Sequence, residues 1–162
     1  MKRINLVCLL ALLSMILLPW PGAAVGKARP PAQEREEPTR REDPDKAITT
    51  LIRDLQLDLE SSSSRNLLNK IDSSKFDDYP RFEDMVERLL RENSLRAFFR
   101  QASKTIRESS AQTILDAEME ISRNDAAGQT DRRHQQIVID FELTSRGWKI
   151  VNITPRDFFT PL

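Results

Sequence analysis

The feature that most limits the possible folds is a change in the spacing of apolar residues along the chain. Between residues 48 and 90, apolar residues recur every three or four positions, which is typical of amphipathic helices. In residues 112–121 and 135–144, apolar and polar residues alternate, which is typical of strands with one buried face. A loop at 124–128 and the turn Arg146–Gly147 separate these runs from each other and from a third run at 148–154. Short connections of this kind join antiparallel neighbours, so the pattern predicts a sequentially paired antiparallel sheet.

Three helices are predicted before the strands. Asp43 and Pro44 open the first, because Asp accepts hydrogen bonds from free N–H groups and Pro suits the first helical position. The serines at 61–64 end this helix and begin a short second one, and Pro80 begins a third that stops near Asn93. The apolar stripes comprise Ile48, Leu51, Ile52, Leu55 and Leu59 in the first helix, Leu67, Leu68 and Ile71 in the second, and Phe82, Met85, Val86, Leu89 and Leu90 in the third.

Residues 95–108 fit either a helix or a strand. We interpret them as a strand, because Ser109 and Ser110 form a turn before a segment with clear alternation. The chain is therefore predicted to be α+β, with N-terminal helices packed on an antiparallel meander of four or more strands. One domain would cover residues 44–162, with Phe158 and Phe159 packed on its edge.

The first 26 residues have the three parts of a secretion signal: a basic start at 1–3, an apolar run at 6–18 and small residues at 23–26. A membrane span needs about twenty apolar residues, which is more than this run provides. We therefore expect cleavage between about Ala24 and Ala28, and a periplasmic or secreted mature protein. The alternative is that the segment stays as a membrane anchor.

Residues 27–43 are nearly all proline or charged and polar residues, which predicts a disordered linker. The only cysteine, Cys8, lies in the apolar run, so the mature protein would contain no disulfide. The formal net charge of the chain is zero. Nucleic-acid binding calls for a clustered basic excess, so we expect neither a nucleic-acid partner nor a membrane partner after cleavage.

Three helices followed by a meander that ends on Gly147-Trp148-Lys149-Ile150-Val151-Asn152-Ile153 resemble the nuclear-transport-factor-2-like, or SnoaL-like, superfamily, as an exported bacterial member of unknown role. The resemblance covers about residues 43–159. It implies a cone, in which a bent sheet wraps the helices and leaves a pocket between them. It also implies a frequent pairing of subunits sheet to sheet. Because members include isomerases, dehydratases and transport adaptors, the resemblance implies a shape and no particular reaction.

The expected turn centres set the register of the strands. A loop centred near Ala127 would place Glu120 opposite His134, and the second turn would place Phe141 opposite Asn152. The inner face would then hold Phe99, Leu115, Ala117, Met119, Ile137, Ile139, Phe141, Leu143 and Ile150.

Catalytic chemistry would have to involve His134, the only histidine. The resemblance implies a histidine and an aspartate inside the cone, whereas the register places His134 on the outer face. Asp140 lies six residues further along the same strand, roughly 20 Å away, which is beyond hydrogen-bond reach. One histidine and no mature cysteine also argue against zinc. We therefore predict no catalytic residue, no metal site and no cofactor.

Two sets of residues remain as candidate sites. Polar residues placed on the inner face would line the mouth of a small apolar pocket: Gln101, Ser103, Thr113, Gln135, Asn152 and Thr154. Apolar residues placed on the outer face would form an exposed patch and a dimer interface: Ile114, Val138, Val151 and Ile153.

The function expected from these observations is that of an exported, non-enzymatic binding or accessory domain. It would form a homodimer and bind an envelope protein or a small apolar ligand. One alternative is a small isomerase or dehydratase that uses the cone pocket. Another is a purely structural dimer module of an envelope complex.

Overall fold

The structure is a computed structural model that describes residues 43–125 and 130–162. The predicted secretion signal, and the predicted linker apart from Asp43, lie outside the described residues. Helices precede strands, as predicted: α1 (Pro44–Glu60), α2 (Ser64–Leu68), α3 (Tyr79–Glu92), β1 (Asn93–Ile106), β2 (Ser110–Arg123), β3 (Thr130–Thr144), β4 (Gly147–Thr154) and a 3₁₀ turn η1 (Arg156–Phe159). The interpretation of 95–108 as a strand is confirmed by β1. No helix in the described part of the chain is long and apolar enough to span a membrane.

The helix ends follow the local signals in the sequence. The Asp43 carboxylate accepts a hydrogen bond from the Asp45 amide at 3.0 Å, so it caps α1 as expected. Asn93 ends α3, where its side-chain amide donates to the Leu89 carbonyl at 2.9 Å and the backbone turns extended. This residue therefore converts the last helix directly into the first strand.

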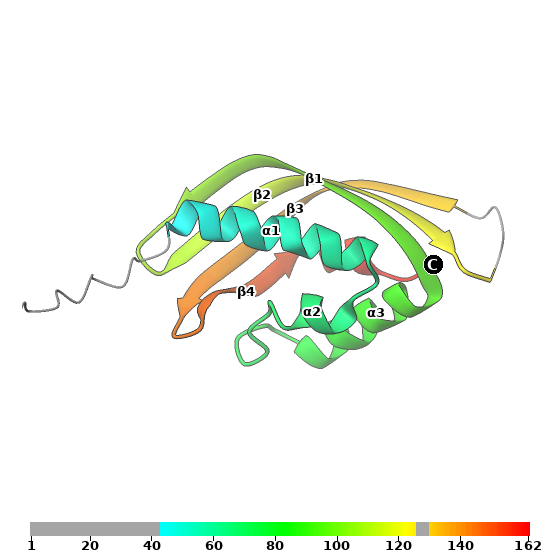
Figure 1. The fold of residues 1–162 in the computed structure, drawn as a ribbon, viewed down its shortest axis with the longest axis horizontal. Helices are drawn as coiled ribbons and strands as arrows, with labels where there is room; N and C mark the ends of the chain where they lie inside the picture. Colours follow the sequence, from blue (N-terminus) through cyan, green and yellow to red (C-terminus); the bar gives the residue numbers. More distant parts are fainter. Residues whose placement is uncertain (1–42, 126–129) are drawn as a thin grey trace, which may run out of the picture. The chain divides into compact units, whose positions relative to one another are not determined.

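The four strands form one antiparallel sheet in the order β1-β2-β3-β4. Figure 1 shows the bent sheet with α1 lying across its concave side and α2 and α3 beside α1. The segment between α2 and α3 joins β4 through a parallel bridge of Ile71 and Ile150. Main-chain hydrogen bonds of 2.9 Å from Asp72 to the Ile150 carbonyl and from Ile150 to the Lys70 carbonyl hold this bridge.

The pairing of β2 with β3 differs from the expected register by two residues. Glu118 lies opposite His134, and Glu120 lies opposite Arg132. A shift of two residues leaves every side chain on its expected face, because the side-chain period of a strand is two. The predicted inner face is therefore confirmed, except that Leu143, near the β3–β4 turn, is 47% exposed.

A bulge in β4 changes the faces of the residues that follow it. Phe141 pairs with Ile150, so the expected pairing of Phe141 with Asn152 was wrong. Asp140 pairs with Asn152, so Val151 is an extra residue in β4. Ile153 consequently turns inward and is fully buried opposite Ile139. The prediction that Ile153 lies on the outer face was therefore wrong, because it assumed an unbroken alternation.

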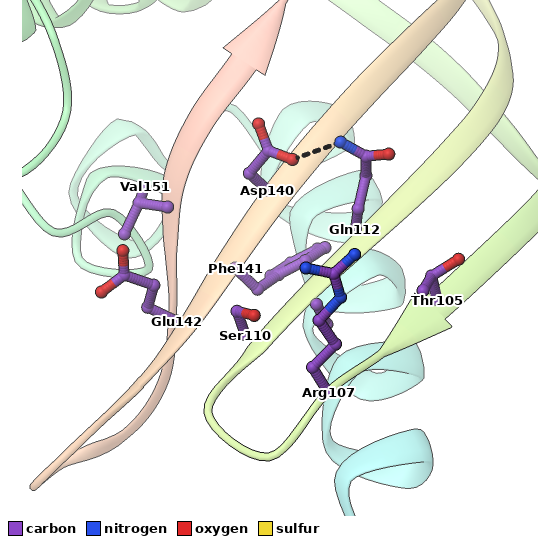
Figure 2. Close-up of a pocket in the computed structure, with 9 residues that line it drawn as sticks. Thr105, Arg107, Ser110, Gln112, Asp140, Phe141, Glu142 and Val151 are labelled. Carbon is purple, nitrogen blue, oxygen red and sulfur yellow. Dashed lines mark hydrogen bonds between the residues drawn. The ribbon is translucent and has the colours of Figure 1, made fainter.

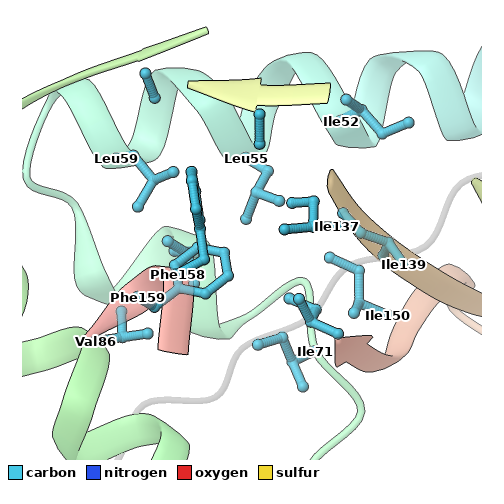
Figure 3. Packing of buried hydrophobic residues seen from close by; sticks show 14 of the residues in the cluster. Ile52, Leu55, Leu59, Ile71, Val86, Ile137, Ile139, Ile150, Phe158 and Phe159 are labelled. Carbon is cyan, nitrogen blue, oxygen red and sulfur yellow. The ribbon is translucent and has the colours of Figure 1, made fainter. Parts of the chain in front are cut away.

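The core fills the space between the helices and the sheet. Figure 3 shows Leu55 and Leu59 of α1 and Val86 of α3 close to the rings of Phe158 and Phe159, with Ile137, Ile139 and Ile150 of the sheet in the same cluster. Both rings are fully buried. The expectation that they pack on the domain edge was wrong, since η1 turns them into the interior of the domain.

Candidate functional site: the outer face of the sheet

The outer face of the sheet carries a charged ladder across three strands. Its outward residues on β2 are acidic, and those on β3 are basic or neutral. Three rows form the ladder: Arg96, Glu120 and Arg132; Phe98, Glu118 and His134; and Arg100, Asp116 and Gln136. The sheet therefore places a negative strand between two strands that carry positive charge.

Each acidic residue of the ladder has a partner on a neighbouring strand. The closest charged atoms of Arg132 and Glu120 are 3.1 Å apart, and those of Arg100 and Asp116 are 2.8 Å apart. His134 Nε2 and Glu118 Oε1 are 4.0 Å apart, and both side chains are well exposed. The expected pairing of Glu120 with His134 was wrong, because the register differs by two residues. Pairs as exposed as these contribute little to stability.

Asp116 is held as a carboxylate by its neighbours. Hydrogen bonds from Arg100 and then from Gln136, the latter at 3.2 Å, lower the pKa of Asp116 below its ordinary value. Because the folded pKa lies below the unfolded one, this interaction contributes stability above the unfolded pKa. That contribution is lost as the pH falls through the folded pKa. Asp116 is therefore charged at neutral pH and is unsuited to donate a proton there.

Two grooves open on the outer face. The larger, of about 650 Å³, runs beside Phe98 and is lined by the charged residues of the first two rows. Phe98 is 61% exposed, which is unusual for a ring of its size. Its outward direction follows from the inward alternation of Leu95, Ala97 and Phe99, although the sequence analysis did not select it as a site residue.

The second groove, of about 360 Å³, lies at the other end of the face beside the bulge (Figure 2). Asp140 lines this groove and accepts hydrogen bonds from Gln112 at 2.8 Å and from Asn152 at 3.1 Å. Val151 and Glu142 line the same groove. Both carboxylate oxygens of Asp140 accept hydrogen bonds from side-chain amides. The polar side chains at this end of the face therefore hold one another in place.

The structure does not bring the six predicted pocket residues together. Thr113 is fully buried, Gln135 is half-buried and Gln101 is exposed, and all three belong to the inner face by their pairing. Bulges in β1 and β4 place the other three on the outer face: Ser103, Asn152 and Thr154. The Thr113 hydroxyl has no hydrogen-bond partner among the described residues.

Three of the four predicted interface residues lie on the outer face. Ile114 and Val138 are direct cross-strand neighbours and are half-buried, and Val151 is the half-buried bulge residue. Ile153 does not belong to this surface. Within the described residues, no group of three or more His, Cys, Asp and Glu side chains is placed to hold a metal ion.

Comparisons with known proteins establish the fold. No family model matches the sequence, and a search of the curated proteins gave no match. A conserved protein from Planctomyces limnophilus matches with a TM-score of 0.62 over 67% of this chain and 91% of that one, at 13% identity. A nuclear transport factor 2-like protein from Salmonella enterica matches with a TM-score of 0.57 over 68% and 87%, at 12% identity. A candidate dehydratase of the same family from Streptomyces avermitilis matches with a TM-score of 0.54 over 68% and 93%, at 9% identity.

The chain therefore has the nuclear-transport-factor-2-like fold, and the resemblance drawn from the sequence is confirmed at this level. Identities this low show the fold alone, and proteins that share this fold differ in function. The function must consequently be argued from the surfaces and side chains of this chain.

Proposed function

We propose that this chain is an exported, non-enzymatic binding module that works through the outer face of its sheet. The observation that carries the proposal is the exposed Phe98 beside a groove of about 650 Å³, on a face that also carries Ile114 and Val138. Contiguous exposed apolar patches with polar rims mark interaction surfaces, and we take Phe98, Ile114 and Val138 to form such a patch. The interior, by contrast, is packed with buried aromatic and aliphatic side chains.

The position of the ionisable groups supports a binding role over catalysis. The imidazole of His134 is 70% exposed, and its nearest carboxylate, Glu118, is 65% exposed. General acid–base catalysis works best where water is excluded and the reacting groups are held in place. An exposed pair on a solvated sheet face meets neither condition.

The partner that fits this face best is a second copy of the chain. A two-fold axis parallel to the strands, between β2 and β3, would lay the acidic outward row of one copy over the basic and neutral row of the other. The same operation would bring the side chains of Ile114 and Val138 of the two copies together. The face is therefore complementary to itself in both charge and apolarity, as an isologous interface requires.

The dimer can be tested by sedimentation of the exported protein at micromolar concentration. We expect Val138→Glu to weaken association at least about 100-fold, because an unpaired carboxylate at the centre of an interface costs several kcal/mol. Leu57→Glu is the matched control, since Leu57 is an exposed apolar residue (51%) on α1, away from this face. A monomeric wild-type protein, or a Val138→Glu variant that still dimerises, would contradict the proposed interface.

Export is part of the same proposal and is tested separately. We expect cleavage between about Ala24 and Ala28, so the intact mass of the mature protein should lack about the first 24 residues or more. Mass spectrometry of protein recovered from the periplasm or medium measures this. A recovered chain that retains Cys8 would contradict cleavage and favour the anchored alternative.

A small isomerase or dehydratase remains the alternative function, and a structural match with a candidate dehydratase speaks for it. It would require an acid or base inside the domain. Two of the predicted pocket residues that face inward, Thr113 and Gln135, are neutral amide or hydroxyl groups. An isomerase or dehydratase activity that persists in the His134→Gln variant and is lost in the Gln135→Leu variant would favour this alternative over the binding role.

A further inference from the structure

The segment that follows β4 places two aromatic rings inside the core of the domain. The rings of Phe158 and Phe159 lie 5.2 Å apart, edge to face, and both are fully buried. Phe159 packs edge to face on Phe82 of α3 at 5.6 Å, and Phe158 lies 6.4 Å from Phe99 of β1. Each ring therefore packs against aromatic and aliphatic side chains of other elements.

Within residues 43–125 and 130–162, one side chain forms hydrogen bonds with the main chain of this segment. Arg133, on the inner side of β3, donates hydrogen bonds to the carbonyl of Phe158 at 3.0 Å and to the carbonyl of Thr160. The Arg133 side chain is only 20% exposed, and Asp131 fixes it by a contact of 3.1 Å at Nε. Arg133 therefore binds two backbone carbonyls of the segment. A guanidinium can hold the main chain of a bound peptide in the same way, because it presents several N–H donors in a fixed plane.

Beyond the two buried rings and Arg133, the segment is joined to other elements through side chains: Arg156 lies 4.6 Å from the centre of the Phe76 ring and 4.0 Å from the Asp77 carboxylate, and the Thr160 hydroxyl contacts Met85. No main-chain hydrogen bond connects residues 156–162 to another element in the described part of the chain, and the Thr160 amide bonds locally to Asp157. A groove of about 260 Å³ runs along the seam between the segment and α3, lined by Met85, Phe82 and Thr160 among others. Strands β1 to β4, by contrast, are joined to one another by antiparallel ladders of main-chain hydrogen bonds.

Two adjacent rings seated on aromatic side chains and main-chain carbonyls held by a guanidinium are features that this segment shares with a bound peptide. We propose that the interior of the domain is a binding site for a peptide segment with two adjacent aromatic residues, and that residues 155–162 are its occupant in cis. The occupant can leave as a unit and be replaced by the same sequence supplied in trans. This inference concerns the interior and does not rest on the role proposed for the outer face.

The experiment begins with the complete, folded protein. A protease recognition sequence is inserted after Thr154, which is exposed, and is cut after folding. A synthetic, fluorescently labelled peptide of residues 155–162 is then added in excess. We expect the cut protein to keep its circular dichroism spectrum and the labelled peptide to enter saturably as the unlabelled one leaves.

Two pairs of controls identify the site. A peptide carrying Phe158→Ala and Phe159→Ala should compete at least about 100-fold less well, because each ring fills a desolvated pocket. Arg133→Gln should speed release of the peptide at least about tenfold, the size expected for a lost charge-assisted hydrogen bond. Arg132→Gln, one residue away but on the outer face, should leave the release rate unchanged.

The inference is overturned if the cut protein unfolds, because the segment would then be an indispensable part of the core. It is equally overturned if the protein stays folded and no peptide exchanges. Competition by the alanine peptide at the strength of the natural one would also overturn it, since the rings would then not be what the site recognises.

Discussion

Ile153→Asp is expected to unfold the domain, whereas Val151→Asp should leave it folded. The two residues lie two apart in β4, and an unbroken strand would place both on the same face. The bulge at Val151 separates them, so Ile153 is fully buried opposite Ile139 and Val151 is half-buried on the outer face. The pair therefore tests the bulge directly.

The expected sizes differ widely. At position 153 the change removes a buried aliphatic side chain and buries an unpaired carboxylate, for a combined loss of about 4 kcal/mol or more. At position 151 the carboxylate can reach water, so the loss should be about 1 kcal/mol or less. Urea unfolding of both variants at one protein concentration measures this. Equal tolerance of the two substitutions would show that β4 runs without a bulge.

The bulge also marks the limit of what could be predicted from the sequence. Element types and faces followed from apolar spacing, because a helix and a half-buried strand each impose a period. The expected β2–β3 register differed from the observed one by two residues. The side chains were nevertheless assigned to the correct faces, because a shift of two residues equals the side-chain period of a strand. An extra residue such as Val151 shifts every later side chain by one, and no residue in Asn152, Ile153 or Thr154 signals it. Those positions were consequently assigned to the wrong faces.

The candidate sites were harder to predict than the fold for the same reason. The outward positions of Ile114 and Val138 could be read from the alternation of their own strands. The neighbours of Phe98 could not be predicted from the sequence, because they depend on how β1, β2 and β3 align. The residues that surround Phe158 and Phe159 could not be predicted from the sequence either. They come from α3 and β1, which lie far from residues 158 and 159 along the chain.

A second large effect is expected at the nearly buried ion pair between Asp58 of α1 and Lys70, which follows α2. The two side chains are 11% and 15% exposed, and the ammonium donates directly to the carboxylate. Lys70 also donates to the Asn66 carbonyl at 3.3 Å, whereas the Asp58 carboxylate has no side-chain hydrogen-bond partner other than Lys70 among the described residues. Removing the lysine therefore leaves the Asp58 carboxylate without a side-chain partner, whereas removing the aspartate leaves Lys70 with the Asn66 carbonyl.

We expect Lys70→Met to reduce the free energy of unfolding by about 3–5 kcal/mol, because it leaves an uncompensated carboxylate in a nearly buried position. Asp58→Leu should cost less, since the lysine keeps a carbonyl partner and its long stem can carry the ammonium toward water. The double variant Asp58→Leu with Lys70→Met should recover most of the loss, because an apolar pair of similar volume often replaces a buried ion pair without cost. Urea unfolding of the four proteins gives the coupling energy. Additive losses would contradict this account, since they would mean that the two charges stabilise the junction of α1 and α2 independently of each other.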